Sequence, residues 1–425
     1  MHKISFGAIA DDLTGGVELA SMLVAAGVRT QFFVGPLRDD PVVNADAVVV
    51  ALKSRVAPTE VASQMCLDAG RFLAAHQPRQ MFFKYCSTFA STPKGNIGPC
   101  VDHLMELSGA AQTIFCPAFP ELDRTIYNGH SFSGEVLLSN SPKRFDPATP
   151  MTESNLVDVL RPQTARKVGL LRWSRLTQGA EACLADLRQK QAAGIDYVIV
   201  DALCDDDLAR IAEFSRDWPL VTGHSAMIRH YPAHWRAMNW IDEAATPQPL
   251  PAVSGPGAIV AGSCSRRNLE QLASFEQSGR PVLRIDLNDA ANGVDIVETA
   301  LAWATDRIGD NPFAIATSAS PQAVEELQTR LGREEASRLA DDALARIAAG
   351  LVARGIRRLL VSGGETSGAV VDALKIRELS LGPYAKGKIP LSVVEGPTRL
   401  GLCLKSGALG GDEVFNEHLE AMASR

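Results

Sequence analysis

The chain lacks the sequence patterns that mark several common enzyme classes. It has no Gly-x-x-x-x-Gly-Lys-Ser/Thr loop, no Gly-x-Gly-x-x-Gly after an apolar run and no His-Glu-x-x-His pair. Its eight cysteines are scattered and form no Cys-x-x-Cys pair. This spacing excludes a cysteine zinc site and a disulfide framework, so we expect reduced thiols, as in a cytoplasmic protein.

An excess of positive charge is absent as well. Lys and Arg number 42 against 49 Asp and Glu, which gives a formal net charge of −7, so the basic surface of a nucleic-acid-binding protein is not expected. The chain has no apolar run of the length that crosses a membrane, and its first residues lack the apolar core of a signal peptide. We therefore predict a cytoplasmic protein whose partners include neither nucleic acid nor membrane.

What the chain does have is enough apolar material for two domains. Hydrophobic residues make up 46% of its 425 residues, and this length exceeds what one ordinary core accommodates. A segment rich in proline and small residues runs from Ala244 to Pro256, and proline disfavours helix in the residue before it. Such a segment is typical of a semi-rigid linker, so we predict domains at residues 1–245 and 255–425.

On both sides of this linker, short apolar runs alternate with amphipathic segments. The runs are rich in β-branched and aromatic residues without strict alternation, as parallel strands are when both faces are buried. This order predicts an α/β fold of two domains, each with a mainly parallel sheet flanked by helices, and a ligand cleft between them. The expected strands are 4–10, 30–34, 47–52, 81–85, 113–116 and 197–200 in the first domain and 258–261, 282–286, 313–317 and 358–361 in the second.

Two adjacent carboxylates, Asp11 and Asp12, directly follow the first expected strand. Such a pair is costly at a strand end unless it binds a metal, a polyol or cationic side chains. The alternative is a solvated turn that caps the next helix, with Thr14 as the N-cap residue. Residues 19–26 have helical periodicity, and Gly27 predicts the end of that helix.

A second polar cluster follows the strand expected at 81–85. Residues 84–98 contain several hydroxyls, two lysines and an asparagine. Lysine and hydroxyl donors match a carboxylate, and an asparagine can bind a sugar hydroxyl. The cluster predicts an anionic, hydroxylated small molecule, while each single Ser or Thr is also ordinary in a loop. The side chains predicted to bind this molecule, two of which follow the strand at 47–52, are Lys53, Arg55, Lys84, Ser87 and Asn96.

The second domain has glycine-rich turns after three apolar runs. Residues 362–368 read Ser-Gly-Gly-Glu-Thr-Ser-Gly and open a helical segment. This order suits a phosphate, because small residues allow close approach and unpaired N–H groups at a helix start carry partial positive charge. Residues 262–268 and 401–411 repeat the order. The alternatives are a tight turn without ligand, a helix cap by Ser263 or Ser265, and a chain-terminal turn at 401–411.

One further pattern indicates a different chemistry. Gly223-His-Ser-Ala-Met227 comes close to the nucleophile elbow of an esterase, but the last residue is not glycine. An esterase would also need a buried carboxylate beside Ser225 and His224, and the sequence does not indicate where one lies. We therefore disfavour this interpretation.

The motifs at these positions resemble those of the four-carbon acid sugar kinases. The resemblance covers both expected domains, and segments 84–88 and 117–125 are most similar to the branch that acts on 3-oxo-tetronates. The chain departs from the family pattern at Leu13, Gly16 and Ala90 and within 223–226. The motifs that carry the resemblance are Ala10-Asp-Asp-Leu-Thr-Gly15, Ser91-Thr-Pro-Lys-Gly-Asn-Ile-Gly98, Ser362-Gly-Gly-Glu-Thr-Ser-Gly368 and Leu404-Lys-Ser-Gly407.

The resemblance implies a sugar-acid-binding N-terminal domain and an ATP-binding C-terminal domain. With ATP and Mg²⁺, the enzyme would phosphorylate the terminal (4-) hydroxyl of a four-carbon acid, foremost 3-oxo-tetronate and alternatively D-threonate or D-erythronate. Asp12 or Asp11 would orient the attacking hydroxyl or help hold Mg²⁺. The resemblance is also compatible with a homodimer. The residues that would bind the nucleotide are Ser263, Ser265, Ser362, Gly363, Gly364, Glu365, Thr366, Gly407 and Gly410.

Two functions of other classes stay open at this point. A sugar-acid sensor without catalysis and a nucleotide-dependent oxidoreductase are both compatible with α/β domains. Neither explains why hydroxyl-rich and glycine-rich strand ends occur in different domains.

Overall fold

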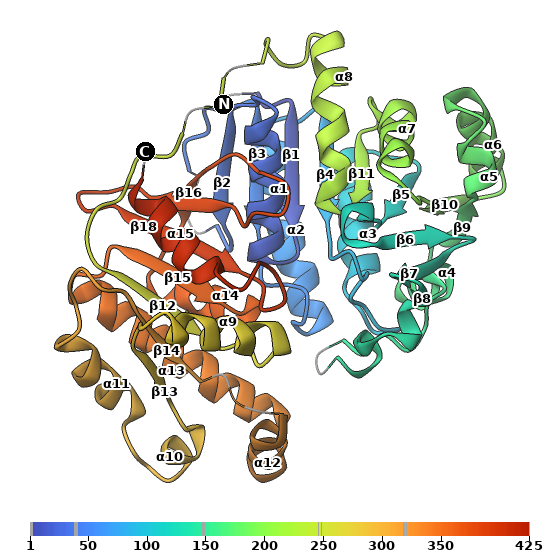
Figure 1. Ribbon diagram of the computed structural model, residues 1–425. Helices are drawn as coiled ribbons and strands as arrows, with labels where there is room; N and C mark the ends of the chain where they lie inside the picture. Colours follow the sequence, from blue (N-terminus) through green and yellow to red (C-terminus); the bar gives the residue numbers. More distant parts are fainter. Residues whose placement is uncertain are drawn as a thin grey trace. The chain divides into compact units, whose positions relative to one another are not determined.

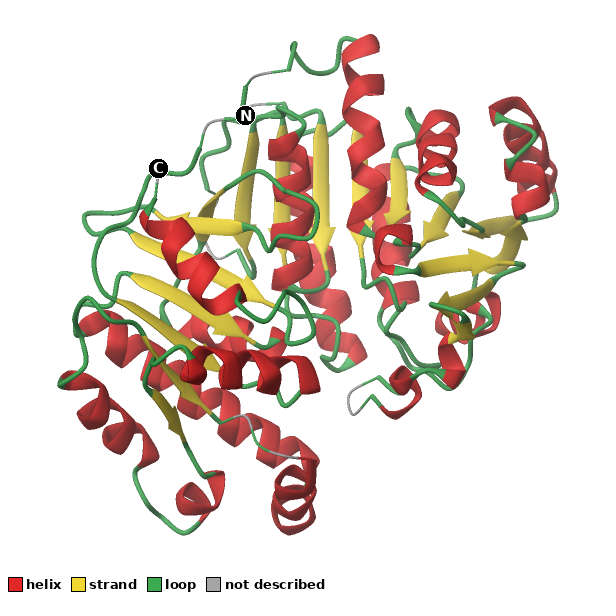
Figure 2. Cartoon of the chain, viewed as in Figure 1, coloured by secondary structure: helices red, strands yellow, loops and turns green. Residues whose placement is uncertain are grey.

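The computed structural model describes residues 3–37, 41–146, 149–244, 246–247, 249–317, 319 and 321–424. The backbone divides into two compact units, residues 1–247 and 248–425. Each unit contains a sheet covered by helices (Figures 1 and 2). The predicted fold class, two α/β units with mainly parallel sheets, is confirmed.

The sheet of the N-terminal unit is built from parallel strands. Strands β1 and β3 are buried along their whole length, as expected for apolar strands covered on both faces. In sheet order the strands are β2 (Thr30–Val34), β3 (Ala47–Ala51), β1 (Phe6–Ala10), β4 (Gln80–Lys84), β11 (Leu220–Gly223), β5 (Thr113–Cys116), β10 (Ile195–Val200) and β9 (Lys167–Leu171).

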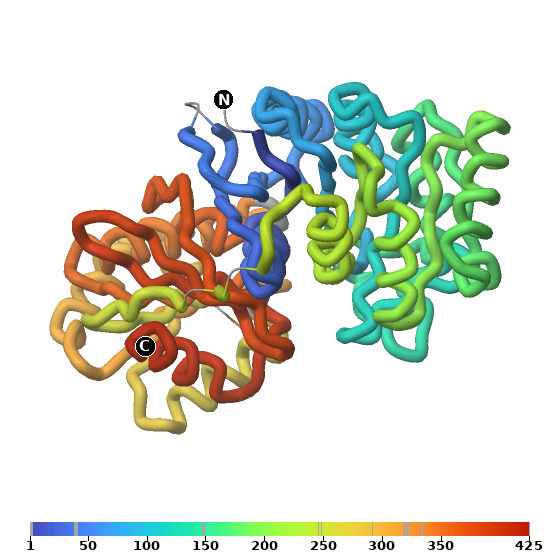
Figure 3. The backbone as a smooth tube through the Cα atoms, turned by 90° about the horizontal axis from the view of Figure 1, so that it is seen from above, coloured from blue at the N-terminus to red at the C-terminus, as the bar shows by residue number. Residues whose placement is uncertain are grey.

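Helices cover both faces of this sheet. Figure 3 shows α2 (Thr59–Ala75) and α3 (Ile97–Ser108) beside each other on one face, with α1 (Leu13–Ala25) on the opposite face. Helix α1 ends where the sequence predicts, since Ala26 is its C-cap and Gly27 has a φ of 71°. The remaining helices of the unit are α4 (Leu156–Leu160), α5 (Trp173–Leu176), α6 (Ala180–Ala192), α7 (Asp205–Ser215) and α8 (Tyr231–Ala237), and the 3₁₀ helices are η1 (Pro120–Leu122), η2 (Leu138–Asn140), η3 (Pro142–Phe145), η4 (Arg161–Gln163) and η5 (Ser225–His230).

A small antiparallel sheet lies between β5 and β9 in the sequence. It consists of β6 (Arg124–Tyr127), β7 (His130–Ser133) and β8 (Val136–Leu137). The sequence did not predict it, because strands of two to four residues with several polar side chains have no clear hydrophobic period. Strands β9 and β11 were also missed; β9 begins with a lysine and β11 ends in a glycine.

The sheet of the C-terminal unit is parallel except at one end. In order its strands are β13 (Val282–Arg284), β14 (Phe313–Ala316), β12 (Gly257–Ala261), β15 (Arg358–Ser362), β18 (Leu400–Lys405), β17 (Leu391–Val394) and β16 (Glu378–Leu381), with β17 and β16 antiparallel to their neighbours. The helices of this unit are α9 (Arg266–Gln277), α10 (Leu287–Ala291), α11 (Ile296–Thr305), α12 (Pro321–Leu331), α13 (Arg333–Ala353), α14 (Gly364–Ala373) and α15 (Val414–Ala423).

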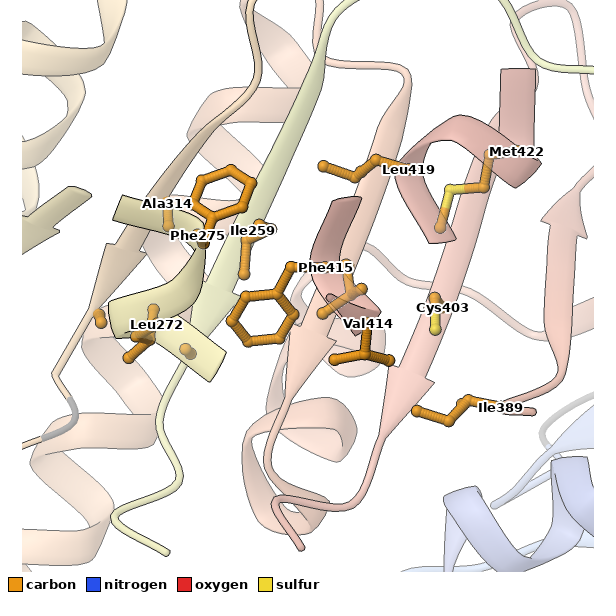
Figure 4. Close-up of a cluster of buried hydrophobic side chains, with 13 residues drawn as sticks. Ile259, Leu272, Phe275, Ala314, Ile389, Cys403, Val414, Phe415, Leu419 and Met422 are labelled. Atoms are coloured by element: carbon orange, nitrogen blue, oxygen red, sulfur yellow. The ribbon is translucent and has the colours of Figure 1, made fainter. Parts of the chain in front are cut away.

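The core of the C-terminal unit holds α9 and α15 against the sheet. Phe275 of α9 and Phe415 of α15 lie edge to face, with ring centroids 6.1 Å apart. Figure 4 shows these rings beside Ile259 of β12 and Cys403 of β18. Each fully buried aromatic side chain contributes about 2–3 kcal/mol. This packing holds the C-terminal half of α9 and the start of α15 against the sheet.

None of the described helices combines the length and the apolar character needed to cross a bilayer.

Candidate active site

The carboxyl ends of four strands bring the predicted sugar-acid residues together in the N-terminal unit. Ala10 pairs with Ala51 of β3 and with Lys84 of β4, and Lys84 pairs with Gly223 of β11. Because these strands are parallel and in register, the segments that follow them leave the sheet as neighbours. Asp11 and Asp12 are in the first of these segments.

Arg55 and Lys84 neutralise this pair of carboxylates. Arg55 donates from Nε and Nη2 to Asp11 at 3.0 and 2.8 Å and from Nη2 to Oδ1 of Asp12 at 2.6 Å. Lys84 Nζ lies 3.1 Å from the same Oδ1. The pair thus has the cationic partners that its position at a strand end requires.

The charges of the two cations keep Asp12 ionised. Burial acts to raise the pKa of its carboxyl, but Arg55 and Lys84 outweigh this effect and lower the pKa well below the usual range. Burial likewise acts to lower the pKa of Lys84, and Asp12 and Asp11 raise it overall. Both partners therefore stay charged at neutral pH.

Asp12, and not Thr14, is the N-cap of α1. Its Oδ1 accepts the Gly15 N–H at 3.2 Å, while the Thr14 hydroxyl donates to Oδ2 at 2.5 Å. The sequence assigned the cap to Thr14 because Thr is a favoured cap residue. The structure assigns the cap to Asp12 because its backbone is extended (φ −141°, ψ 159°) and precedes the first helical turn. The predicted cap at Thr14 is therefore wrong, and Asp12 both caps the helix and binds two cationic side chains.

The other predicted sugar-acid residues lie in the same set of loops. The amide of Asn96 is buried and donates to the carbonyls of Ser54, Arg55 and Ala57 at 2.7, 3.2 and 2.9 Å. It therefore shapes the loop that carries Arg55. Lys53 and Ser87 are partly exposed after β3 and β4.

Three residues that the sequence analysis did not assign to this site join it. Glu18 of α1 accepts a hydrogen bond from the Ser225 hydroxyl, and its Oε2 lies 3.5 Å from Nε2 of His224. His224 stacks on Phe119 with ring centroids 4.4 Å apart. Glu18 is the one charged residue in the sequence of α1, and this isolation in an apolar helix was the signal that could have revealed it.

A carboxylate, that of Glu18, does lie beside Ser225 and His224. The geometry of the three side chains nevertheless rejects the esterase interpretation. Ser225 Oγ donates to Glu18 directly and lies 3.4 Å from both ring nitrogens of His224. The Ala226 N–H occupies Nδ1 of His224 at 3.1 Å. A catalytic triad instead needs the serine to donate to the histidine, whose other nitrogen binds the carboxylate. Ser225 is also fully buried.

The glycine-rich loops of the C-terminal unit also leave neighbouring strands. Ala261 pairs with Ser362, and Ser362 with Lys405, at the ends of β12, β15 and β18. The loops approach so closely that side chains would collide. A Cβ on Gly407 would lie 1.8 Å from Ser263 Oγ, and one on Gly363 would lie 2.7 Å from Thr366 Oγ1.

Two amide side chains of α9 hold these loops in place. Asn268 donates to the carbonyl of Ser263 at 2.7 Å and accepts the Ser362 hydroxyl at 2.6 Å. Gln271 donates to three consecutive carbonyls, those of residues 409–411, at 3.0 Å each. One turn of α9 therefore joins the loops that follow β12, β15 and β18. The sequence analysis missed both amides, because their partners are distant in the chain.

The side chains of three predicted nucleotide residues serve the protein itself. Ser265 caps α9 by accepting the Asn268 N–H, so the helix-cap alternative holds for it. Ser362 is bonded to Asn268, and the Thr366 hydroxyl donates to Asp341 at 2.8 Å. By contrast, Gly364 and Glu365 are exposed at the start of α14, and a Cβ on Gly364 would meet nothing within 4 Å. In the loop between β15 and α14, the backbone is therefore accessible at Gly364.

Lys405, at the end of β18, supports the third loop. Its Nζ donates to the carbonyls of Ser406 and Gly407 at 3.1 Å each. Burial lowers the pKa of Lys405 to about 8. Among the described residues, no group of three or more His, Cys, Asp or Glu side chains is arranged to hold a metal ion.

Comparison with known proteins identifies both units. A family model described as a sugar-binding N-terminal domain matches residues 6–231, and one described as a nucleotide-binding C-terminal domain matches residues 258–415. The chain belongs to the four-carbon acid sugar kinase family. The resemblance inferred from the motifs is confirmed.

Relatives with the name 3-oxo-tetronate kinase match nearly the whole chain. The protein of Cupriavidus necator is 42% identical over 99% of this chain and 98% of its own length. That of Burkholderia multivorans is 43% identical over 98% and 97%, and that of Escherichia coli K12 is 35% identical over 89% and 98%. These relatives support a sugar-acid kinase activity, and the nucleotide-binding unit supports the use of ATP.

Solved structures share the fold. A protein from Salmonella typhimurium LT2 is 34% identical with a TM-score of 0.82, and the match covers 97% of this chain and 98% of that one. Haemophilus influenzae protein HI1011 is 32% identical with a TM-score of 0.75, over 98% and 100%.

Proposed function

We propose that the protein transfers the γ-phosphoryl group of ATP to the 4-hydroxyl of 3-oxo-tetronate. The observation that carries this proposal is the whole-length similarity, at 35–43% identity, to relatives named 3-oxo-tetronate kinase. The polar loops of the N-terminal unit and the glycine loops of the C-terminal unit support it, because a short hydroxy acid and a nucleotide need these two kinds of site.

The substrate carboxylate is proposed to bind Arg55 together with Lys53. The N–H groups on Nε and Nη2 of Arg55 serve Asp11 and Asp12, and Nη1 carries two further donors. A guanidinium held from one side by two aspartates presents the other side to an anion in a fixed orientation. Lys53 and Ser87, both partly exposed in adjacent loops, would add contacts to the acid.

Asp11 and Asp12 are proposed to position the two cations. Asp12 is bonded to Arg55, Lys84, Thr14 and the Gly15 N–H, and its low pKa makes it a weak proton acceptor. Lys84 would then face the reacting end of the substrate with its charge intact. This is a positioning role for the two aspartates, in place of the role in orienting the hydroxyl or holding Mg²⁺ that the motif implied.

The nucleotide is proposed to bind through the backbone at the start of α14. Gly363 is the N-cap residue of this helix, and its own N–H donates to the carbonyl of Lys405 at 2.8 Å. The N–H groups of the first turn, which begins at Gly364, have no partner within the helix and attract phosphate. Mg²⁺ would enter as part of the MgATP substrate, since this ion usually keeps phosphate oxygens and waters among its ligands. Asn268, Gln271 and Lys405 would hold the surrounding loops.

A coupled assay of ADP release over a panel of four-carbon acids tests the proposal. We expect turnover with 3-oxo-tetronate, ATP and Mg²⁺, and ³¹P and ¹³C NMR should place the phosphate on O4. Higher kcat/KM with D-threonate or D-erythronate would reassign the substrate within the family. Binding of an acid without ADP release at any concentration of ATP would leave a sugar-acid sensor and reject the kinase.

A further inference from the structure

We infer that Glu18 is the general base that accepts the proton of the substrate hydroxyl, and that Ser225 and His224 position its carboxylate. This inference rests on the proposed kinase activity and adds the residue that carries out the proton transfer. Glu18 lies within electrostatic reach of Lys84 and Asp12, which belong to the network of the sugar-acid site.

One carboxylate oxygen of Glu18 has no hydrogen-bond partner among the described residues. Its two side-chain contacts, with the Ser225 hydroxyl and with Nε2 of His224, both involve Oε2. No described group forms a hydrogen bond to Oε1. The side chain is 19% exposed, although its neighbours Val17 and Leu19 are buried. Oε1 is therefore the oxygen through which a bound hydroxyl can reach this carboxylate.

The aspartates of the same site have no such oxygen. Both oxygens of Asp11 accept from Arg55. Oδ1 of Asp12 accepts from Arg55, Lys84 and the Gly15 N–H, and its Oδ2 accepts from Thr14. A carboxylate held by two cations and a helix N-terminus is stabilised in its charged form and takes up a proton poorly.

The electrostatic surroundings of Glu18 favour the opposite behaviour. Burial raises the pKa of Glu18, and Asp12 and Glu121 add to this effect, while Lys84 and the Ser225 hydroxyl oppose it without reversing it. A general base works best when its pKa is raised toward the operating pH. The charged and titratable groups that face Glu18 are Lys84 of β4, Asp12 at the cap of α1, Glu121 of η1 and His224 after β11.

His224 faces Glu18 as a neutral ring. Its Nδ1 accepts the Ala226 N–H at 3.1 Å, so the proton of the neutral ring is on Nε2, which faces Oε2 of Glu18. Burial, together with the charge of Lys84, lowers the pKa of His224 well below its usual value. The stacked Phe119 ring fixes the plane of the imidazole. Ser225 and His224 therefore engage Oε2 and leave Oε1 for a bound hydroxyl.

The proposed reaction step transfers the γ-phosphoryl group to the substrate oxygen and the hydroxyl proton to Glu18. The substrate oxygen forms a bond to the γ-phosphorus as the bond from that phosphorus to the β,γ-bridging oxygen breaks, and ADP leaves with the electron pair. The hydroxyl proton passes to Oε1 of Glu18, which releases it to water after the product departs. Lys84 remains protonated throughout and stabilises the charge near the transferring group.

The test compares Glu18→Gln with the wild type in steady-state assays of ADP release. We expect kcat to fall about 10²–10⁴-fold, the range for removal of a general base, with the KM values for the acid and for ATP changed less than about threefold. Glu60→Gln, an exposed residue of α2, is the matched control and should keep full activity. A Glu18→Gln enzyme that keeps more than a third of the wild-type kcat would overturn the inference.

A pH profile separates a catalytic role from a structural one. The kcat/KM of the wild type should decline on the acid side as Glu18 becomes protonated, and this limb should be missing in Glu18→Gln. Ser225→Ala removes a hydrogen bond that lowers the pKa of Glu18, so its acid limb should move to higher pH. An unmoved limb in Ser225→Ala would overturn the inference even if Glu18→Gln does not fold. Absence of ADP release by the wild type itself would reject the proposed function instead.

Discussion

The ammonium group of Lys84 occupies the space beside Gly15 where a side chain would begin. A Cβ built on Gly15 would lie 1.5 Å from Nζ and 2.5 Å from Cε of Lys84. Lys84 is 3% exposed, and its Nζ is bonded to Asp12 at the cap of the same helix. Position 15 must therefore be glycine, because the ammonium group of Lys84 fills the space of a side chain there.

Gly15→Ala should displace Lys84 and disable the sugar-acid site. We expect a loss of about 1–3 kcal/mol in the free energy of unfolding, because the extra methyl overfills a packed region, and at least a tenfold fall in kcat/KM for the acid. Urea unfolding and the ADP-release assay measure the two effects. Gly309→Ala, where a Cβ meets nothing within 4 Å, is the control. Unchanged activity in Gly15→Ala would mean that Lys84 does not serve the site.

Asp12→Asn should lower stability in a pH-dependent manner. The folded-state pKa of Asp12 lies well below its ordinary value of 3.8, so its contribution to stability is fully present above this pH and is lost as the pH falls toward the folded-state pKa. At pH 7 the variant should lose about 3 kcal/mol, because the buried Lys84 and the partly buried Arg55 keep their charges with one counter-charge fewer. The difference between the variant and the wild type should shrink below about pH 4.

Urea unfolding between pH 3 and pH 7 measures this difference. Asp158→Asn, which breaks an exposed ion pair with Arg161, is the matched control and should change stability by less than about 0.5 kcal/mol. A difference for Asp12→Asn that stays constant down to pH 3 would contradict the assignment of the low pKa.

Gly364→Val should remove ATP binding without loss of stability. The position is exposed, and a Cβ there meets nothing within 4 Å, so the free energy of unfolding should change by less than about 1 kcal/mol. The added side chain would cover the N–H groups proposed to bind phosphate. Isothermal titration with an ATP analogue should show at least a tenfold loss of affinity, while binding of the acid is retained. Unchanged ATP affinity would place the nucleotide elsewhere.

Asn268→Ala should weaken ATP binding through the loops that the asparagine joins. The carbonyl of Ser263 and the buried hydroxyl of Ser362 would each lose a partner, at a cost of about 1–3 kcal/mol. We expect the KM for ATP to rise about tenfold or more, with the KM for the acid unchanged. Asn416→Ala, at an exposed site, is the control. An equal rise of both KM values would contradict a role confined to the nucleotide loops, and a fall in kcat with both KM values unchanged would indicate general unfolding.

Much of the fold was readable from the order of residues. The buried strands β1, β3 and β15 were predicted because their apolar residues have no other place to go than the middle of a sheet. The end of α1 at Gly27 was predicted because glycine adopts positive φ readily. The short polar strands β6–β8 and the short strand β16 were not predicted, because only pairing with a neighbour makes such segments extended.

The candidate site divides in the same way. The sequence by itself determined which segments lie at the carboxyl ends of the sheets, because polar and glycine-rich residues placed directly after apolar parallel strands have that one structural outcome. Only the tertiary structure decided which side chains meet there. Glu18 and Ser225 are 207 positions apart, and Asn268 and Ser362 are 94 apart, so no local pattern connects them. Strand register and side-chain packing created those contacts. They also pair Asp12 with Arg55 and Lys84, while one carboxylate oxygen of Glu18 has no hydrogen-bond partner among the described residues.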